Sequence, residues 1–157
     1  MLPDLLANDL KLVICGSAAG QKAADVGQYY AGPGNALWRT LFEIGLTPRE
    51  LAPAEWEQLL EYRIGLTDLV KDQSGADSGI RFSGGADLRK KIRKYQPRVL
   101  AFNGKRAAQE YFGLATVAYG LLPSTIDRTT LYVAPSTSAA ARGNWDPRYW
   151  QALARLV

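Results

Sequence analysis

The sequence predicts an α/β domain built around a mainly parallel sheet. Short apolar runs with strand character, among them residues 12–14 and 99–102, alternate with longer segments of helical periodicity. Strands separated by helices in this way are typical of a parallel sheet covered by helices. The length of 157 residues suits one domain of ordinary size, so we expect residues 1–157 to form a single domain.

The first part of the chain begins with a strand and a turn. Residues 11–15 are predicted as a short buried strand, which leads into a turn of small residues at 16–20. Asn35 then occupies the position of a helix cap, and that helix is expected to end before Gly45. Its apolar stripe consists of Leu37, Trp38, Leu41, Phe42 and Ile44.

Helices and strands alternate through the rest of the chain. A second helix is predicted over 53–62, with Pro53 near its first turn. Residues 65–70 fit either a strand or a loop, and the glycine-rich stretch 71–85 is predicted as a loop. A basic amphipathic helix is expected over 86–95, ending before Pro97. The remaining predicted elements are strands at 99–102 and 129–133 and helices at 106–112 and 147–157.

The loops that follow the strands are the predicted ligand site. In open parallel sheets, ligands bind beyond the carboxyl ends of the strands. Small or polar loops follow Cys15, Phe102 and Ala134. We therefore expect these three loops to lie at the same edge of the sheet.

Composition excludes several classes of protein. The chain has one cysteine, Cys15, and no histidine. An internal disulfide, a four-thiolate zinc site and every mechanism that needs a histidine are therefore excluded, and the composition offers no obvious metal site. No stretch approaches the roughly 20 apolar residues of a membrane span. The N-terminal residues also lack the basic region of a signal peptide, which predicts an intracellular protein.

The positive charge is concentrated in one segment. The net charge is +4, but residues 81–106 alone carry nine basic side chains and one acidic side chain, Asp87, whereas the rest of the chain has ten basic and fourteen acidic side chains. A basic segment on a near-neutral body is typical of nucleic-acid binding. For residues 89–94 taken alone, a solvated helix face explains the charges equally well.

Five motifs carry more specific information than composition does. They are YYAGPGNALW at 29–38, GLTDLV at 65–70, KYQPR at 94–98, FNGK at 102–105 and YVAPSTS at 132–138. In this order and spacing, from about Lys11 to Arg142, they resemble the thymine/mismatch-specific uracil-DNA glycosylase family. The resemblance implies a three-layer α/β/α sandwich with a short, mainly parallel central sheet and no cofactor.

The resemblance also implies a reaction. Members of that family hydrolyse the N-glycosidic bond between deoxyribose and uracil, or a related deaminated or damaged base, in base-excision repair of DNA. The target base must be flipped into a pocket that offers a stacking face and polar groups. No lysine occupies a recognised nucleophile position, so we expect hydrolysis that leaves an abasic site without strand cleavage.

Several residues are assigned to the base pocket by this resemblance. Tyr30 corresponds to the stacking aromatic, although it could instead fill the core, and Tyr29 precedes it in the same motif. The turn that contains Gly16 and Ser17 would present backbone amides to the negative charge that develops on the departing base. Asn35 is expected either in the pocket or as a helix cap.

One position departs from the family pattern. The first catalytic motif usually reads Gly-Ile-Asn-Pro-Gly, and its Asn positions the attacking water. Here residues 16–20 read GSAAG, so Ala18 replaces that Asn. A methyl group cannot orient water, so the usual catalytic side chain of the family is absent.

Two interpretations of this loss remain open. In the first, Asp68 takes over by accepting from the base edge, orienting water or stabilising the sugar cation, with Ser17 as a weaker candidate. Asp68 could instead cap a helix or form a surface ion pair. In the second, the protein has lost its chemistry and binds uracil or abasic DNA without cleaving it. We favour the active enzyme because removing one catalytic group leaves much of an enzyme's acceleration intact.

The second family motif predicts DNA contacts. Ser136, Thr137 and Ser138 are expected near phosphates and the minor groove, although this loop could simply cap a helix. Alanines follow where relatives carry a bulky wedge, and Arg142 is the nearest large side chain. A weak wedge predicts a preference for single-stranded DNA or weak pairs such as G·U over A·U. Asn103 and Lys105 are expected either to contact phosphate or to cap the following helix.

The expected partner is thus uracil-containing DNA, and we expect a cytoplasmic, nucleoid-associated monomer. A free-nucleoside hydrolase or nucleotide-binding protein is a third interpretation, disfavoured because a small substrate needs neither the basic segment nor the 135–138 loop. The four tryptophans are predicted to pack in the core or on the surface. Trp145, near the second motif, is the one tryptophan that we place close enough to contact DNA.

Overall fold

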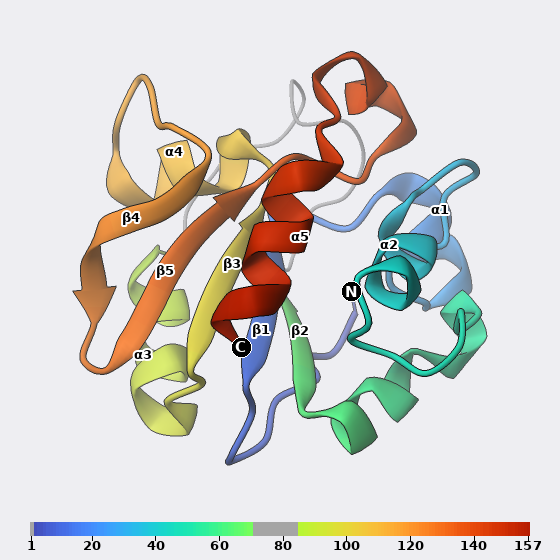
Figure 1. Cartoon of the computed structure of the whole chain (residues 1–157), viewed down its shortest axis with the longest axis horizontal. Helices are drawn as coiled ribbons and strands as arrows, with labels where there is room; N and C mark the ends of the chain where they lie inside the picture. The colour runs from blue at the N-terminus through green and yellow to red at the C-terminus, as the bar shows by residue number, and fades with distance from the viewer. Residues whose placement is uncertain (1, 71–84) are drawn as a thin grey trace.

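A computed structural model describes residues 2–70 and 85–157 and contains a five-stranded sheet (Figure 1). The strand order is β2-β1-β3-β5-β4. Strands β2 (Ile64–Asp68), β1 (Leu12–Gly16), β3 (Val99–Asn103) and β5 (Thr129–Ala134) run parallel, and β4 (Gly120–Ile126) pairs with β5 in the antiparallel direction. The predicted α/β class with a mainly parallel sheet is confirmed.

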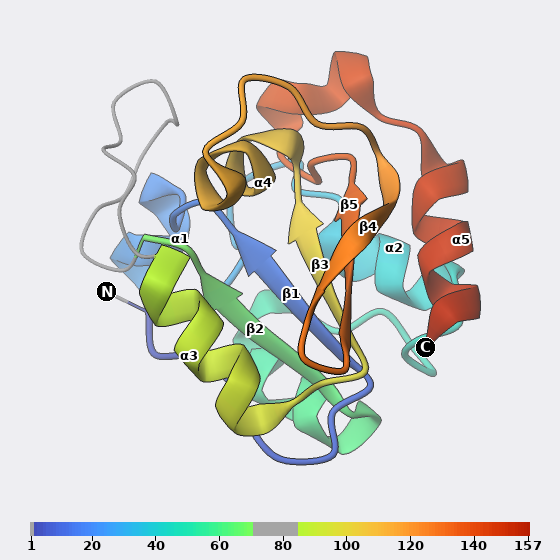
Figure 2. The ribbon, with the colours of Figure 1, turned by 90° about the vertical axis from the view of Figure 1, so that its left-hand side faces the viewer.

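Helices cover both faces of the sheet, which makes the three-layer arrangement visible in Figure 2. Leu12 and Ile14 of β1 point into one core cluster, whereas Val13 and Cys15 point into the other. Because the parallel strands are buried on both faces, they appear in the sequence as continuous apolar runs. The first cluster includes residues of α1 (Gln21–Val26), α2 (Leu37–Glu43), η1 (Pro53–Tyr62) and α5 (Pro147–Leu156), and the second includes residues of α3 (Gly85–Tyr95) and α4 (Lys105–Phe112).

The helix that begins after Asn35 largely follows the prediction. The Asn35 side-chain oxygen accepts from the backbone N–H of Leu37, the first residue of α2, at 3.1 Å, but the N-cap position itself belongs to Ala36, one residue later than predicted. The helix ends at Glu43, before Gly45. Phe42, however, is 44% exposed, so its assignment to the buried stripe is wrong. The neighbouring Leu41 takes the inward position on this helix.

Other elements match the prediction only in part. Residues 64–68 form a strand, which resolves the strand-or-loop ambiguity, and 53–62 form a 3-10 helix rather than a regular α-helix. The predicted loop at 71–85 lies outside the described residues except for Gly85, which begins α3. Three elements were not predicted: α1, β4 and the short 3-10 helix η3 (Ala139–Asn144).

The topology brings the motif loops to one edge of the sheet. Gly16 at the end of β1 pairs with Asp68 at the end of β2, and Asn103 at the end of β3 pairs with Ala134 at the end of β5. Parallel strands place these ends together, as the sequence predicted. Among the helices described, none is long and apolar enough to cross a membrane.

Candidate active site

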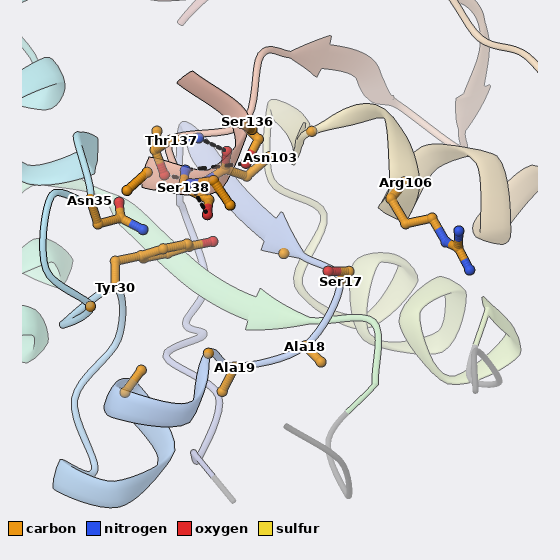
Figure 3. Close-up of a pocket in the computed structure, with 18 of the residues that line it drawn as sticks. Ser17, Ala18, Ala19, Tyr30, Asn35, Asn103, Arg106, Ser136, Thr137 and Ser138 are labelled. Atoms are coloured by element: carbon orange, nitrogen blue, oxygen red, sulfur yellow. Dashed lines mark hydrogen bonds between the residues drawn. The ribbon is translucent and has the colours of Figure 1, made fainter. Parts of the chain in front are cut away.

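A cavity of about 600 Å³ opens at the carboxyl edge of the sheet (Figure 3). The turn after β1 supplies one wall, built from residues without bulky side chains: Gly16, Ser17, Ala18, Ala19 and Gly20. Of the residues predicted for the site, all but Arg142 line this cavity. They are Gly16, Ser17, Ala18, Tyr29, Tyr30, Asn35, Asp68, Asn103, Lys105, Ser136, Thr137 and Ser138.

Gly16, Tyr30 and Asp68 meet at the base of the cavity. A Cβ atom at Gly16 would lie 2.7 Å from Asp68 Oδ1 and 3.1 Å from the hydroxyl oxygen of Tyr30. Any side chain at position 16 would therefore collide with the Asp68 carboxyl. Asp68 is 5% exposed, which places its carboxyl group inside the protein rather than in a surface ion pair. The alternative interpretation of Asp68 as a surface residue is wrong.

Tyr30 has an unusual backbone that its surroundings hold in place. Its φ of 51° lies in the left-handed region, which aromatic residues rarely adopt. The backbone carbonyl of Tyr30 accepts a hydrogen bond from Trp38 Nε1 at 3.2 Å. Such backbone strain persists only where surrounding contacts enforce it, and it concentrates at functional sites. Figure 3 shows the Tyr30 ring extending into the cavity from its loop, with Asn35 on one side of it.

Charge and burial act together on the Tyr30 hydroxyl. Burial raises its pKa well above the ordinary value, and the nearby Asp68 carboxylate raises the pKa further. The side-chain amide of Asn103 lowers the pKa in part. The hydroxyl therefore stays protonated throughout the physiological range and can act as a hydrogen-bond donor.

Tyr29 supports the site from behind. It is 1% exposed, and its hydroxyl donates to the carbonyl of Pro3 at 2.9 Å. Its ring packs 5.3 Å from the ring of Trp56 and 6.1 Å from the ring of Tyr30. Burial, followed by the charges of Asp68 and Asp4, raises the pKa of Tyr29 above its usual range. Although Tyr29 borders the cavity, its hydroxyl is thus engaged by the N-terminal segment.

The turn after β1 is fixed by the strand beside it. The carbonyl of Gly16 accepts from the N–H of Leu69, and the carbonyl of Ser17 accepts from the N–H of Val70, both at 2.8 Å. Because the two residues that follow β2 hold these carbonyls, the turn keeps its position beside Asp68. Ser17 and Ala18 are half-buried, and Ala18 presents only a methyl group to the cavity wall.

The second motif loop is anchored by Asn103. The Asn103 amide donates to the Thr137 hydroxyl at 2.9 Å, and its carbonyl oxygen accepts from the Thr137 N–H at 3.0 Å (dashed lines in Figure 3). Asn103 makes no cap on α4, whose N-cap residue is Gly104, so the helix-capping alternative for Asn103 is wrong. Thr137 is only 2% exposed, and its side chain serves to hold the loop in place.

The two serines of this loop differ from Thr137 in their exposure. Ser136 is half-buried and Ser138 is exposed. The Ser136 hydroxyl oxygen accepts from the N–H of Ser138, and the Ser138 hydroxyl oxygen accepts from the N–H of Ala140, both at 3.2 Å. Ser138 therefore caps η3, in agreement with the structural alternative for this loop. Because a hydroxyl that accepts a hydrogen bond can still donate one, both serines retain a donor for a phosphate oxygen.

Two loops are joined across the cavity mouth, the loop of residues 29–36 and the second motif loop. The N–H of Ala36 donates to the carbonyl of Thr137 at 2.9 Å. Arg142 donates to the carbonyl of Gly34 at 3.4 Å from an exposed position. Lys105 and Arg106 also line the cavity, and Arg106 forms an ion pair with Glu110 at 3.4 Å. Arg106 was not predicted as a site residue. Its position in the basic segment 81–106 was the one signal for it in the sequence.

The basic side chains of α3 are partly paired within the protein and partly exposed. Lys91 forms an ion pair with Asp4 at 2.6 Å, and Arg93 lies 3.8 Å from Asp127. Arg89 donates to the hydroxyl of Tyr111 at 3.2 Å. No residue of α3 lines the cavity that the structure describes, and four of its basic side chains are exposed: Arg89, Lys90, Arg93 and Lys94. The solvated helix face therefore fits, and a contact of this helix with DNA stays a prediction.

The described residues offer no ready metal site. Across 2–70 and 85–157, no three potential metal-binding side chains are grouped closely enough to hold an ion. The polar side chains that line the described cavity include one carboxylate, phenols, amides and hydroxyls. This set can stack on a planar ring, exchange hydrogen bonds with its edge and stabilise developing charge.

Comparisons with known proteins agree with this geometry. The family model of the Uracil DNA glycosylase superfamily matches residues 3–156. The solution NMR structure of a candidate uracil DNA glycosylase from Methanosarcina acetivorans is similar in fold, with a TM-score of 0.64 at 24% identity over 99% of this chain and 96% of that one. Because the family model spans nearly the whole sequence, the chain belongs to the uracil DNA glycosylase superfamily.

Proposed function

We propose that this protein is a monofunctional uracil-DNA glycosylase of the thymine/mismatch-specific branch. It would flip uracil, or another deaminated or damaged base, out of DNA, hydrolyse its N-glycosidic bond and leave an abasic site for base-excision repair. The observation that carries this proposal is the convergence of Tyr30, Asp68 and the 16–18 turn on one cavity of a superfamily member.

Each group in the cavity has a defined part in the proposed reaction. The Tyr30 ring supplies a stacking face, a contact worth roughly 1–3 kcal/mol per base. Backbone N–H groups of Ser17 and Ala18 would stabilise negative charge on the departing base. Asp68 would accept from the base edge, orient the attacking water or stabilise the oxocarbenium-like sugar. Ser17 remains the weaker catalytic candidate, because the chain has no histidine that could activate its hydroxyl.

DNA contacts are proposed at the cavity mouth. Lys105, Arg106 and Arg142 carry positive charge there, and Ser136 and Ser138 offer hydroxyl donors. These side chains fit phosphate binding, which positions DNA without reading its sequence. For Asn103 and Thr137, we propose an indirect role, because their mutual hydrogen bonds hold the loop that carries the two serines.

The second candidate function is damage binding without cleavage. The observation in its favour is Ala18, which stands where the family positions a water-orienting Asn. The same cavity could then retain uracil or an abasic site and release it unchanged. Catalysis on a uracil substrate separates the two candidates directly.

The first test is a glycosylase assay on one uracil placed in single-stranded, G·U and A·U oligonucleotides. We expect excision in all three, fastest in the single strand, then in G·U, and slowest in A·U. The reason is that alanines at 139–141 provide little wedge to replace a well-paired base. Alkali-labile sites reveal abasic products. A clear preference for A·U would contradict the weak-wedge argument, and retained binding without any product would favour the damage-binding function.

The second test is the salt dependence of binding to an oligonucleotide with a tetrahydrofuran abasic analogue. If Lys105, Arg106 and Arg142 each neutralise one phosphate, affinity should fall roughly 20- to 40-fold between about 50 and 200 mM salt. Replacing Lys105 by Gln should lower the slope of log affinity against log salt by about one. An affinity that hardly changes with salt would instead indicate a nucleoside-sized ligand.

A further inference from the structure

Tyr119 is an aromatic residue of the cavity that the proposed reaction does not use. It immediately precedes β4, is half-buried and lines the described cavity together with Lys105. The Nζ atom of Lys105 lies over the Tyr119 ring, 4.3 Å from the ring centroid. At that distance the negative face of the ring attracts the ammonium group. The two residues thus form a cation–π contact inside the candidate site.

The Tyr119 ring is held in place by its neighbours. Gly120, which follows it in the chain, pairs with Val133 of β5, so the backbone here is tied to the sheet. The ring of Tyr149 in α5 packs against the Tyr119 ring with their centroids 5.1 Å apart. The backbone carbonyl of Tyr149 accepts in turn from the hydroxyl of Tyr132 in β5 at 2.6 Å. Contacts from the sheet and from α5 therefore fix the position of the ring.

The backbone of Lys105 is also fixed, at the start of α4 and beside the second motif loop. The N–H of Gly104 donates to the carbonyl of Ala134 at 2.9 Å. Gly104 has a φ of 103°, and a Cβ atom on it would lie 3.1 Å from the Cβ atom of Ser136. The residue before Lys105 therefore touches Ser136, whose hydroxyl is proposed to bind phosphate. This contact places the lysine backbone next to the same phosphate site.

The charge of Lys105 is not neutralised by another described residue. Lys105 forms no ion pair within the part of the chain that the structure describes, whereas the adjacent Arg106 pairs with Glu110 at 3.4 Å. A mobile lysine side chain loses much rotamer entropy when it binds a fixed group. A cation–π contact orders the side chain beforehand and leaves its positive charge in place. An ordered ammonium group of this kind suits phosphate binding.

We propose that Tyr119 is a positioning residue, which holds the Lys105 ammonium group ready for a DNA phosphate beside the flipped nucleotide. The ring attracts the ammonium group without neutralising it, so the cation is already ordered when DNA arrives. Binding then costs less side-chain entropy than it would with a mobile lysine. The inference rests on the proposed DNA-binding function of the cavity and adds to it a residue that acts through Lys105.

Two substitutions separate the Tyr119 ring from its hydroxyl. Tyr119→Leu removes the cation–π contact, whereas Tyr119→Phe keeps an aromatic face for Lys105. We expect the affinity for an oligonucleotide with a tetrahydrofuran abasic analogue to fall about 2- to 10-fold in Tyr119→Leu, the cost of ordering one long side chain on binding. Tyr119→Phe should bind nearly as tightly as the wild type. An equal loss in Tyr119→Phe would assign the effect to the hydroxyl and overturn the inference.

The salt dependence of the affinity distinguishes positioning from charge. In Tyr119→Leu the lysine keeps its charge, so log affinity should be lower at every salt concentration while its slope against log salt stays the same. Lys105→Gln should instead lower that slope by about one. In the Lys105→Gln background, Tyr119→Leu should have no further effect, because both changes remove the same interaction. A further loss in the double variant would indicate that Tyr119 contacts DNA directly, which contradicts the proposal.

Leu122→Ala is the matched control for packing. Leu122 is half-buried and packs against the same core cluster as Tyr119, but it does not line the described cavity. The DNA affinity of Leu122→Ala should equal that of the wild type. A loss as large as that in Tyr119→Leu would attribute both effects to packing and refute a role through Lys105.

An NMR measurement on the free protein separates this inference from the proposed function. The ring current of Tyr119 should shift the ε-methylene protons of Lys105 upfield, and this shift should vanish in Tyr119→Leu. Lys105 protons without the shift in the wild type would overturn the inference and leave the glycosylase proposal intact. A wild type that binds abasic DNA but cleaves no uracil would refute the glycosylase proposal, while the affinities still decide the role of Tyr119.

Discussion

Replacing Asp68 by Ala should reduce the single-turnover rate of uracil excision by about 100-fold or more, the range seen when a positioned acid–base group is removed. Asp68 is the one carboxylate among the described residues that line the cavity, and it is 5% exposed. Ala18 cannot orient water, so the loss of Asp68 would leave only backbone donors and stacking to promote the reaction. The DNA affinity should fall far less than the rate.

Asp68→Asn is the matched comparison, because it keeps the size of the side chain and an oxygen acceptor but removes the charge. If Asp68 acts by its negative charge, the Asn variant should be nearly as slow as the Ala variant. If it acts by positioning the base edge or water, the Asn variant should recover much of the rate. Equal excision by wild type and Ala variant would instead make backbone stabilisation of the departing base the main source of catalysis.

Stability measurements must accompany these rates. Asp68 is buried beside Gly16, and removing a buried charge changes the free energy of unfolding as well as the chemistry. Thermal melts of the three proteins show whether the fold is intact at the assay temperature. A slow variant whose melting midpoint equals that of the wild type assigns the loss to the reaction.

Much of the fold was predictable because local pattern and topology agree. The buried strands appear as continuous apolar runs, and Asn35 and Gly45 bracket the helix between them. Parallel strand order then requires that the loops after β1, β3 and β5 lie at one edge. The sequence pattern alone therefore predicts that Gly16, Asn103 and the 135–138 loop lie at the same edge of the sheet.

What escaped prediction depends on contacts between distant residues. The edge strand β4 contains Pro123 and is largely exposed, which an edge strand tolerates but which hides it in the sequence. Asn103 could be assigned to a phosphate or a helix cap, whereas its partner Thr137 is 34 residues away. The ion pair of Lys91 in α3 with Asp4, 87 positions earlier in the chain, likewise could not be read from the sequence.

For the tryptophans, too, one part of their role could be predicted from the sequence and another part could not. Trp38 and Trp150 are buried and Trp56 is nearly so, as their prediction as packing residues required. Trp38 also holds the Tyr30 carbonyl, a role that no local pattern could reveal. Trp145 is half-buried and packs with its ring centroid 6.4 Å from that of Trp150. A contact between Trp145 and DNA stays a prediction.

Trp150→Ala should destabilise the fold more than any of the active-site substitutions, with a cost of about 3–5 kcal/mol, as expected for truncating a fully buried aromatic residue. Trp150 has no exposed surface, and its Nε1 donates to the carbonyl of Pro135 at 2.9 Å. Since domains are stable by only about 5–15 kcal/mol, this loss would unfold a large share of the molecules on mild heating. Urea denaturation followed by tryptophan fluorescence measures it.

The hydrogen bond to Pro135 links this core residue to the active site, because Pro135 begins the loop of Ser136 and Ser138. Trp150→Phe retains most of the packing but loses the N–H, so it should cost less stability than Ala and still loosen the loop. We expect weaker DNA binding in Trp150→Phe at a temperature where it remains folded, with little change in the excision rate of bound substrate. Leu153→Ala, which removes a buried side chain from the same helix, is the control for packing alone. If Trp150→Phe bound DNA as tightly as the wild type, the loop would be held by the Asn103–Thr137 pair without help from the C-terminal helix.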